Sequence, residues 1–380
     1  MKIGIVTLPF NSNYGGLLQA FALQSSLRNM GHEPTTVYRR NPIMPLHIQI
    51  ISSANRLAKS ILNHKMGVIR SWATAEEELI IDQHTNRFIS ENISTTEMLK
   101  SERDFSGMND KGFEAWVVGS DQVWRPKYSP SLSNHFLGFV TDSFKAKRVS
   151  YAASFGVDQW EFSPDQTEKC RKLLLKFDAV SVREDSGVKL CGENLRVEAK
   201  QVLDPTLLLP KEEYIRLVEK DSIAACDGTL LTYVLDKAPD KIDFIRKVAE
   251  EKGLRVISIM PKSLFRDAGR KRIDDCIYPP VTAWLRGFMD AECVITDSYH
   301  GMVFAIIFNK PFLALGNSKR GMARFSSLLK LFGLEERMAL STEENLMGKL
   351  NAPIDFSKVN DILMVKRHES LAFLENSLKT

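Results

Sequence analysis

Residues 2–40 have the sequence KIGIVTLPFNSNYGGLLQAFALQSSLRNMGHEPTTVYRR, and the order of apolar and small residues in this stretch predicts the fold class. An apolar strand over residues 2–8 is followed by a glycine-containing loop over residues 9–16. Apolar side chains then recur at helical spacing over residues 17–31, and a second strand follows over residues 34–40. A strand, a helix and a strand at this pace predict a parallel, doubly wound α/β sheet.

The same alternation continues in two series that are separated by the segment DPTLLLP over residues 204–210. Each of its two prolines disfavours a helical conformation for the preceding residue, so the segment suits a passage between domains. We predict an N-terminal Rossmann-like domain over residues 1–205, a C-terminal one over residues 206–350, and a helical tail over residues 351–380 that packs back on the body. Two such domains should bind ligands between them, at the carboxyl ends of the strands.

The composition of the chain fits this architecture, with 380 residues, 44% hydrophobic and 26% charged. No stretch approaches the roughly 18 apolar residues needed to cross a bilayer. The start, MKIGIVTLPF, lacks the longer apolar core of a signal peptide, so we expect a cytoplasmic protein. Five cysteines without a C-x-x-C pair indicate free thiols rather than a zinc site. No Asp-x-Asp pair is present, and we expect no metal.

A basic segment interrupts the first domain. Residues 34–75 contain six basic residues and no acidic residue, and apolar residues among them permit a helical insert over about residues 43–75. One interpretation is a solvated helix face. The other is a peripheral surface that contacts the inner face of an anionic membrane, or a lipid-phosphate acceptor. Nucleic-acid binding is not expected, because stacking aromatic residues are not interleaved with the basic ones.

Two motifs of the first domain are candidates for ligand binding. In Asn13-Tyr14-Gly15-Gly16, adjacent glycines between a strand and a helix allow a ligand to approach free backbone N–H groups, although an ordinary tight turn fits equally well. In the segment GSDQVW, which begins at Gly119, Ser120 and Asp121 follow a very apolar strand. The carboxylate of Asp121 can accept a proton from a sugar hydroxyl or, alternatively, cap the next turn.

Arg183 lies at the end of a later strand, in the sequence SVRE. A guanidinium there can bind a carboxylate or phosphate through two parallel hydrogen bonds. The alternative is a surface ion pair with Glu184 or Asp185.

The second domain contains TDSYHG over residues 296–301, which places His300 in the first turn of an apolar helix. Because a helix N-terminus favours anions and disfavours added positive charge, the imidazole is expected to be neutral until an anion binds. Ser298 and Gly301 flank it. Arg320 and Arg324 follow in a segment that we expect to be a loop facing the same cleft, unless it is simply solvated.

Six motifs together resemble the polysaccharide pyruvyl transferase family, in the order of that family and over about residues 1–335. They are NYGGLLQA (13–20), GSDQVW (119–124), YAASFG (151–156), SVREDS (181–186), VLDPT (202–206) and TDSYHGMVFAIIFNKPF (296–312).

The resemblance implies two Rossmann-like domains arranged as in B-type glycosyltransferases. It also implies phosphoenolpyruvate as donor, with no further cofactor, and a sugar of a surface or capsular polysaccharide, or of its lipid-linked precursor, as acceptor. By this resemblance His300 is the general acid and Arg183 holds the donor. We expect Asp121 to act as base. We also expect Ser298, Gly301, Arg320 and Arg324 to bind the donor. The residues expected to bind the acceptor are Asn13, Tyr14, Gly15, Gly16 and Ser120. A nucleotide-sugar glycosyltransferase and a non-catalytic glycan-assembly protein are the alternatives.

Overall fold

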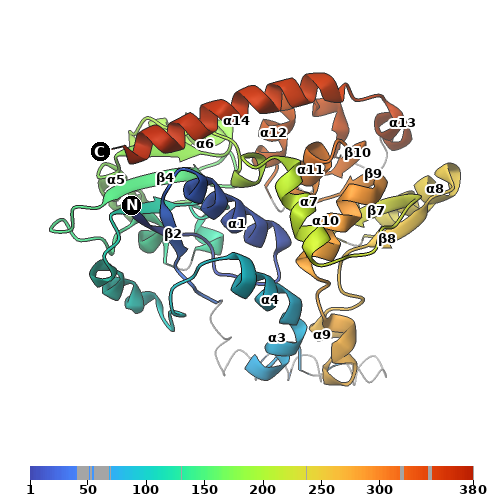
Figure 1. The fold of residues 1–380 in the computed structure, drawn as a ribbon, viewed down its shortest axis with the longest axis horizontal. Helices are drawn as coiled ribbons and strands as arrows, with labels where there is room; N and C mark the ends of the chain where they lie inside the picture. The colour runs from blue at the N-terminus through green and yellow to red at the C-terminus, as the bar shows by residue number, and fades with distance from the viewer. Residues whose placement is uncertain are drawn as a thin grey trace.

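The computed structural model describes residues 1–40, 51, 54, 68, 70–129, 131–236, 238–316, 321–340 and 345–379. The described chain forms two sheets with helices packed around them (Figure 1). Their strand orders are β2-β1-β3-β4-β5-β6 and β11-β10-β9-β7-β8, and the paired strands run parallel. This confirms the predicted pair of Rossmann-like α/β units.

The first sheet is built from short, mostly buried strands, as expected where helices cover both faces. Its strands are β1 (Lys2–Val6), β2 (Glu33–Thr36), β3 (Ala115–Val118), β4 (Lys147–Ala153), β5 (Ala179–Val182) and β6 (Lys200–Gln201). The helices of this half are α1 (Tyr14–Asn29), α3 (Ala75–Ile81), α4 (Gln83–Asn92), η1 (Glu102–Lys111), η2 (Pro126–Tyr128), η3 (Leu132–Phe136), α5 (Pro164–Leu174), α6 (Asp185–Leu190) and η4 (Cys191–Leu195).

The second sheet follows further along the chain. Its strands are β7 (Thr229–Tyr233), β8 (Arg255–Ser258), β9 (Ala291–Thr296), β10 (Phe312–Leu315) and β11 (Met338–Ala339). The helices from Pro205 onward are η5 (Pro205–Leu207), α7 (Lys211–Lys220), α8 (Pro239–Lys252), α9 (Phe265–Ala268), η6 (Arg270–Cys276), α10 (Val281–Asp290), α11 (Tyr299–Ile307), α12 (Ala323–Phe332), η8 (Glu335–Arg337), α13 (Leu346–Asn351) and α14 (Phe356–Leu378). The predicted domain boundary after residue 205 falls between the last strand of the first sheet and the first strand of the second.

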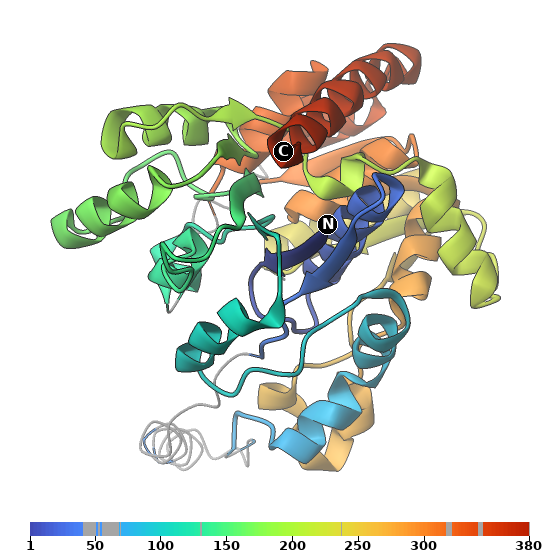
Figure 2. The same cartoon turned by 60° about the vertical axis from the view of Figure 1, so that its left-hand side comes forward.

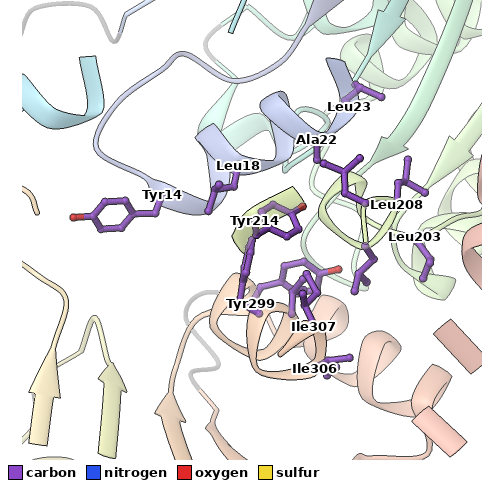
Figure 3. Close-up of a cluster of buried hydrophobic side chains, with 14 of the residues drawn as sticks. Tyr14, Leu18, Ala22, Leu23, Leu203, Leu208, Tyr214, Tyr299, Ile306 and Ile307 are labelled. Atoms are coloured by element: carbon purple, nitrogen blue, oxygen red, sulfur yellow. The ribbon is translucent and has the colours of Figure 1, made fainter. Parts of the chain in front are cut away.

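The two halves share one hydrophobic core. Buried residues of α1, such as Leu18, belong to the same cluster as Leu231 of β7 and Phe304 of α11. Figure 3 shows part of this cluster, with side chains of α1 on one side and those of α11, such as Ile307, on the other. In Figure 2, α3 and α4 lie beside the segment of α9 and η6, where Tyr278 N donates a hydrogen bond to Ile81 O. The second sheet is therefore packed directly against the first half.

Tyr14 lies in this shared core rather than in an acceptor loop. Helix α1 begins at Tyr14, so Gly15 and Gly16 form its first turn instead of a preceding loop. The Tyr14 ring is fully buried and stacks on Trp284 with a centroid distance of 5.7 Å. Its hydroxyl donates a 2.8 Å hydrogen bond to the Pro279 carbonyl of the second half.

The C-terminal helix α14 packs back on the body, as predicted (Figure 1). The Arg367 side chain donates hydrogen bonds to the carbonyls of Leu207 and Leu209, and Ser370 Oγ accepts one from Leu203 N. These contacts hold α14 against the segment that connects the two sheets.

The predicted basic insert over about residues 43–75 lies largely outside the described residues. Among the helices that the structure does describe, none combines the length and the apolar character needed to span a bilayer.

Two substitutions at Tyr14 test its role as a contact between the halves. Tyr14→Phe removes only the hydrogen bond to Pro279 and should lower the free energy of unfolding by about 1 kcal/mol. Tyr14→Ala also empties the ring site and should cost about 3–5 kcal/mol. Urea unfolding measures both. Equal stability of Tyr14→Ala and the wild type would contradict the shared core.

Candidate active site

A pocket of about 290 Å³ lies between the two halves, at the carboxyl ends of strands from both sheets. The first half contributes Asn13, Asp121, Gln122 and Tyr128, and the second contributes Tyr233, Leu235, Asp297, Ser298, Tyr299, His300, Arg324 and Phe325. This is the position that the doubly wound topology predicts for a ligand. We call it the interdomain pocket.

His300 lies in the first turn of α11, for which Ser298 is the N-cap residue without a side-chain capping bond. The backbone of α1 packs directly against the imidazole, because a Cβ added at Gly15 would lie 2.0 Å from His300 Nδ1. Gly301 has a packing role as well, since a Cβ there would lie 2.1 Å from Thr296 Oγ1 at the end of β9. Gly15 thus lets α1 approach His300, and Gly301 lets α11 approach the end of β9.

Arg183 is buried beneath the interdomain pocket instead of lining it. Its Nη1 donates to Asp204 Oδ2 at 2.6 Å, and its Nη2 donates to Asp121 Oδ1 at 3.3 Å. The guanidinium carbon lies 4.4 Å from the centroid of the Tyr299 ring, which adds a cation–π contact. The alternative of a surface ion pair with Glu184 or Asp185 is therefore wrong: the Arg183 side chain is only 1% exposed and pairs with other carboxylates.

The carboxylates beside Arg183 are held in the charged form. Burial alone would raise the pKa of Asp204, but His300, the Arg183 charge and Thr206 hold it well below its usual range. Burial likewise opposes ionisation of Asp121, and the charges of Arg183, His300 and Arg324 outweigh it, so its pKa is also lowered. Asp204 Oδ2 lies 3.7 Å from His300 Nε2, beyond hydrogen-bond distance but close enough to orient the imidazole electrostatically.

Three buried carboxylates of this region were not among the predicted site residues. Asp204 appeared only within a family motif and an interdomain segment. Asp297 accepts hydrogen bonds from the backbone N–H groups of Leu235 and Asp236, which hold the turn after β7. Glu184 accepts hydrogen bonds from Phe155 N and from other donors in the loop after β4, and burial raises the pKa of its carboxyl group. Their position directly after apolar strands was the available signal.

The remaining predicted residues divide between the pocket and its support. Arg324 lines the pocket from the first turn of α12, so the expected loop is helical there, and its guanidinium lies 5.6 Å from the Tyr299 ring centroid. Burial and the neighbouring Arg183 lower its pKa. Ser120 is buried, and its hydroxyl donates to the Ala152 carbonyl at 2.8 Å. Arg320 lies outside the described residues.

The structure therefore brings Asn13, Asp121, Ser298, His300 and Arg324 together at one pocket. Among the described residues, no group of three or more His, Cys, Asp or Glu side chains could hold a metal ion.

Two parallel-sheet units with a pocket between them define a protein of the B-type glycosyltransferase fold. The structure resembles that of the UDP-GlcNAc 2-epimerase of Neisseria meningitidis bound to UDP-GlcNAc, with a TM-score of 0.52 and 10% identity over 98% of this chain and 100% of that one. It also resembles UGT89C1 of Arabidopsis thaliana complexed with UDP-L-rhamnose, with a TM-score of 0.53 and 10% identity over 98% of each chain.

The family model for polysaccharide pyruvyl transferase matches residues 13–319. The chain belongs to this family and is a transferase. No curated protein matches its sequence.

Replacing Arg183 tests the buried ion pairs. Arg183→Ala leaves Asp121 and Asp204 buried without their cation, which should cost about 3–5 kcal/mol at pH 7. In the wild type both pKa values are lowered, so their stabilising contribution is present above about pH 4, the unfolded value, and is lost below it. In the variant the unpaired carboxylates bind protons more readily in the folded state. The stability difference should therefore shrink as the pH falls from 7 toward 4.

Urea unfolding at several pH values measures this difference. Arg246→Ala is the control, because its ion pair with Asp243 is exposed and should contribute less than about 1 kcal/mol. A cost of Arg183→Ala that is small, or the same at pH 7 and pH 4, would contradict the buried network.

The contact between Gly15 and His300 gives a double-mutant test. Gly15→Ala should cost about 1–3 kcal/mol through overpacking against the imidazole. The cost should fall in a His300→Ala background, where the ring is absent. Gly16→Ala is the control, because its Cβ would approach Asn13 only to 3.2 Å. An identical cost of Gly15→Ala in both backgrounds would contradict the contact.

Proposed function

We propose that the protein transfers pyruvate from phosphoenolpyruvate to a sugar of a surface or capsular polysaccharide, or of its lipid-linked precursor, and forms a cyclic ketal. The observation that supports this most strongly is the convergence of Asp121, His300 and Arg324 on one pocket between the two halves. A carboxylate, an imidazole and a guanidinium are the groups needed to accept a proton, donate a proton and bind an anion.

The donor has a carboxylate and a phosphate, so its site must supply positive charge and hydrogen-bond donors. Arg324 supplies the charge, and the first turn of α11 supplies backbone N–H groups that no intrahelical acceptor can satisfy. We expect Arg320 to assist from outside the described residues. The burial of Arg183 favours a positioning role, in which it holds Asp121 and Tyr299 in place.

The reaction requires two sugar hydroxyl groups and one proton donor. A proton added to C3 of the enol phosphate, with His300 as general acid, creates the methyl group and makes C2 electrophilic. The first hydroxyl oxygen bonds to C2 and loses its proton to Asp121. The second hydroxyl oxygen then bonds to C2, while the C2–O bond to phosphate breaks and phosphate leaves with the electron pair. Of the two hydroxyl protons, one makes up for the proton that His300 gave to C3, and the other leaves with phosphate.

Donor binding can be tested by thermal unfolding with phosphoenolpyruvate and, separately, with uridine and cytidine sugar nucleotides. At 100 times its dissociation constant the true donor should add about 2.7 kcal/mol of stability. We expect this shift with phosphoenolpyruvate, its loss in Arg324→Ala and its retention in Arg246→Ala. A shift with a sugar nucleotide alone would instead indicate a glycosyltransferase.

The role of His300 can be tested by phosphate release from phosphoenolpyruvate in the presence of sugar acceptors. General acid catalysis typically contributes 10²–10⁴-fold, so His300→Ala should lower turnover by about that factor. Donor binding in the same variant, measured by the thermal shift, shows that the pocket is intact. Near-normal turnover in a folded His300→Ala protein would remove its role.

The cytoplasmic location and the peripheral contact with a membrane remain proposals that rest on the sequence. A lipid-linked acceptor would explain the excess of basic residues over residues 34–75.

A further inference from the structure

A second pocket, of about 210 Å³, is lined by residues of the first half. Its lining among the described residues includes Asn11 and Ser12 before α1, Arg40 after β2, and Asp82 and Asn86 at α4. Asn11 Oδ1 accepts a 2.8 Å hydrogen bond from the backbone of Asn13, which lines the interdomain pocket. The two pockets are thus joined by one short stretch of chain, which we call the 11–13 loop.

The polar groups of this second pocket are held in place while keeping part of their hydrogen-bonding capacity. Asp82 Oδ1 accepts a 2.9 Å bond from Ser12 Oγ. Asn86 Oδ1 accepts a 2.8 Å bond from Arg40 Nη2, and Arg40 Nε in turn donates to Tyr38 Oη at 3.2 Å. Within the described part of the chain, Asp82 Oδ2 and Asn86 Nδ2 make no further hydrogen bond. A fixed acceptor and a fixed donor therefore remain for a ligand.

The charges and rings of the pocket indicate what kind of ligand it suits. Glu78 and Asp82 provide two carboxylates against the single guanidinium of Arg40, so a phosphate or carboxylate ligand would be repelled. A neutral molecule with several hydroxyl groups suits both the carboxylate acceptors and the amide donor. The aromatic rings of Phe10 and Tyr38, 5.9 Å apart, add apolar surface for the C–H face of a sugar.

The size of the pocket supports the same conclusion. Its volume of about 210 Å³ is below the roughly 300–1,000 Å³ typical of sites for drug-sized ligands, and it suits a single ring.

We propose that this second pocket binds one sugar ring of the acceptor, with Asp82 and Asn86 bonded to its hydroxyl groups. The inference rests on the proposed function, since it assigns the acceptor subsite of that reaction. The 11–13 loop then connects the ring held here with the hydroxyl groups that react in the interdomain pocket.

The test is saturation-transfer-difference NMR of the full-length protein with methyl glycosides of glucose, galactose, N-acetylglucosamine and N-acetylmannosamine. At least one glycoside should bind the wild type. Its affinity should fall about tenfold or more in Asp82→Asn and in Asn86→Ala, because each variant removes one direct hydrogen bond. Ser90→Ala, an exposed change on the same helix, should bind as the wild type does.

Thermal shifts with phosphoenolpyruvate in the same proteins separate this inference from the proposed function. Intact shifts in Asp82→Asn and Asn86→Ala would show that both variants are folded and that the donor lies elsewhere. Wild-type glycoside affinity in both variants would overturn the subsite. Glycoside binding that is lost only in Arg324→Ala would also overturn it. So would a wild type that binds phosphoenolpyruvate but no glycoside. A wild type that binds glycosides through Asp82 but not phosphoenolpyruvate would overturn the donor assignment alone.

Discussion

Arg183 lies at the carboxyl end of β5 with its guanidinium bonded to Asp204 and Asp121 and placed over the ring of Tyr299. A charge buried to this extent is tolerated only when partners compensate the loss of water, so the positions of all four side chains depend on one another. Asp121 and Asp204 come from the first half, and Tyr299 comes from the second. The ion-pair cluster therefore links the two halves directly below the interdomain pocket. It also fixes the orientation of the Asp121 carboxylate and of the N-terminus of α11 in that pocket.

The contact between α1 and α11 extends this link. Gly15 lets the α1 backbone touch the imidazole of His300, while Gly301 lets α11 approach the end of β9. With Tyr14 packed among aromatic residues of the second half, the two sheets share a continuous core instead of meeting across an open cleft. The groups of the interdomain pocket are thus preorganised on rigid elements, which suits a reaction that relies on positioned proton transfer.

Much of the fold was predictable because buried parallel strands and amphipathic helices have short-range signatures. The apolar strand predicted before Ser120 corresponds to β3, and the helical tail predicted over residues 351–380 corresponds to α14. Side-chain environment was less accessible. Arg183 pairs with Asp121, which lies 62 residues away in sequence, so its burial depends on packing that no local pattern records. The first turn of α1 was assigned to a loop because its two glycines favour one locally, whereas both are helical and Gly15 packs against His300. The role of Asp204 was missed for the same reason as the burial of Arg183.

We propose that the interdomain pocket transfers pyruvate to a sugar. Mass spectrometry of a panel of p-nitrophenyl glycosides, incubated with the protein and phosphoenolpyruvate or with UDP-sugars, tests it most directly. We expect one product that has gained a pyruvate ketal, formed with phosphoenolpyruvate alone and absent when His300→Ala replaces the wild type. A product that has gained a sugar unit from a UDP-sugar, with no ketal formed from phosphoenolpyruvate, would contradict it.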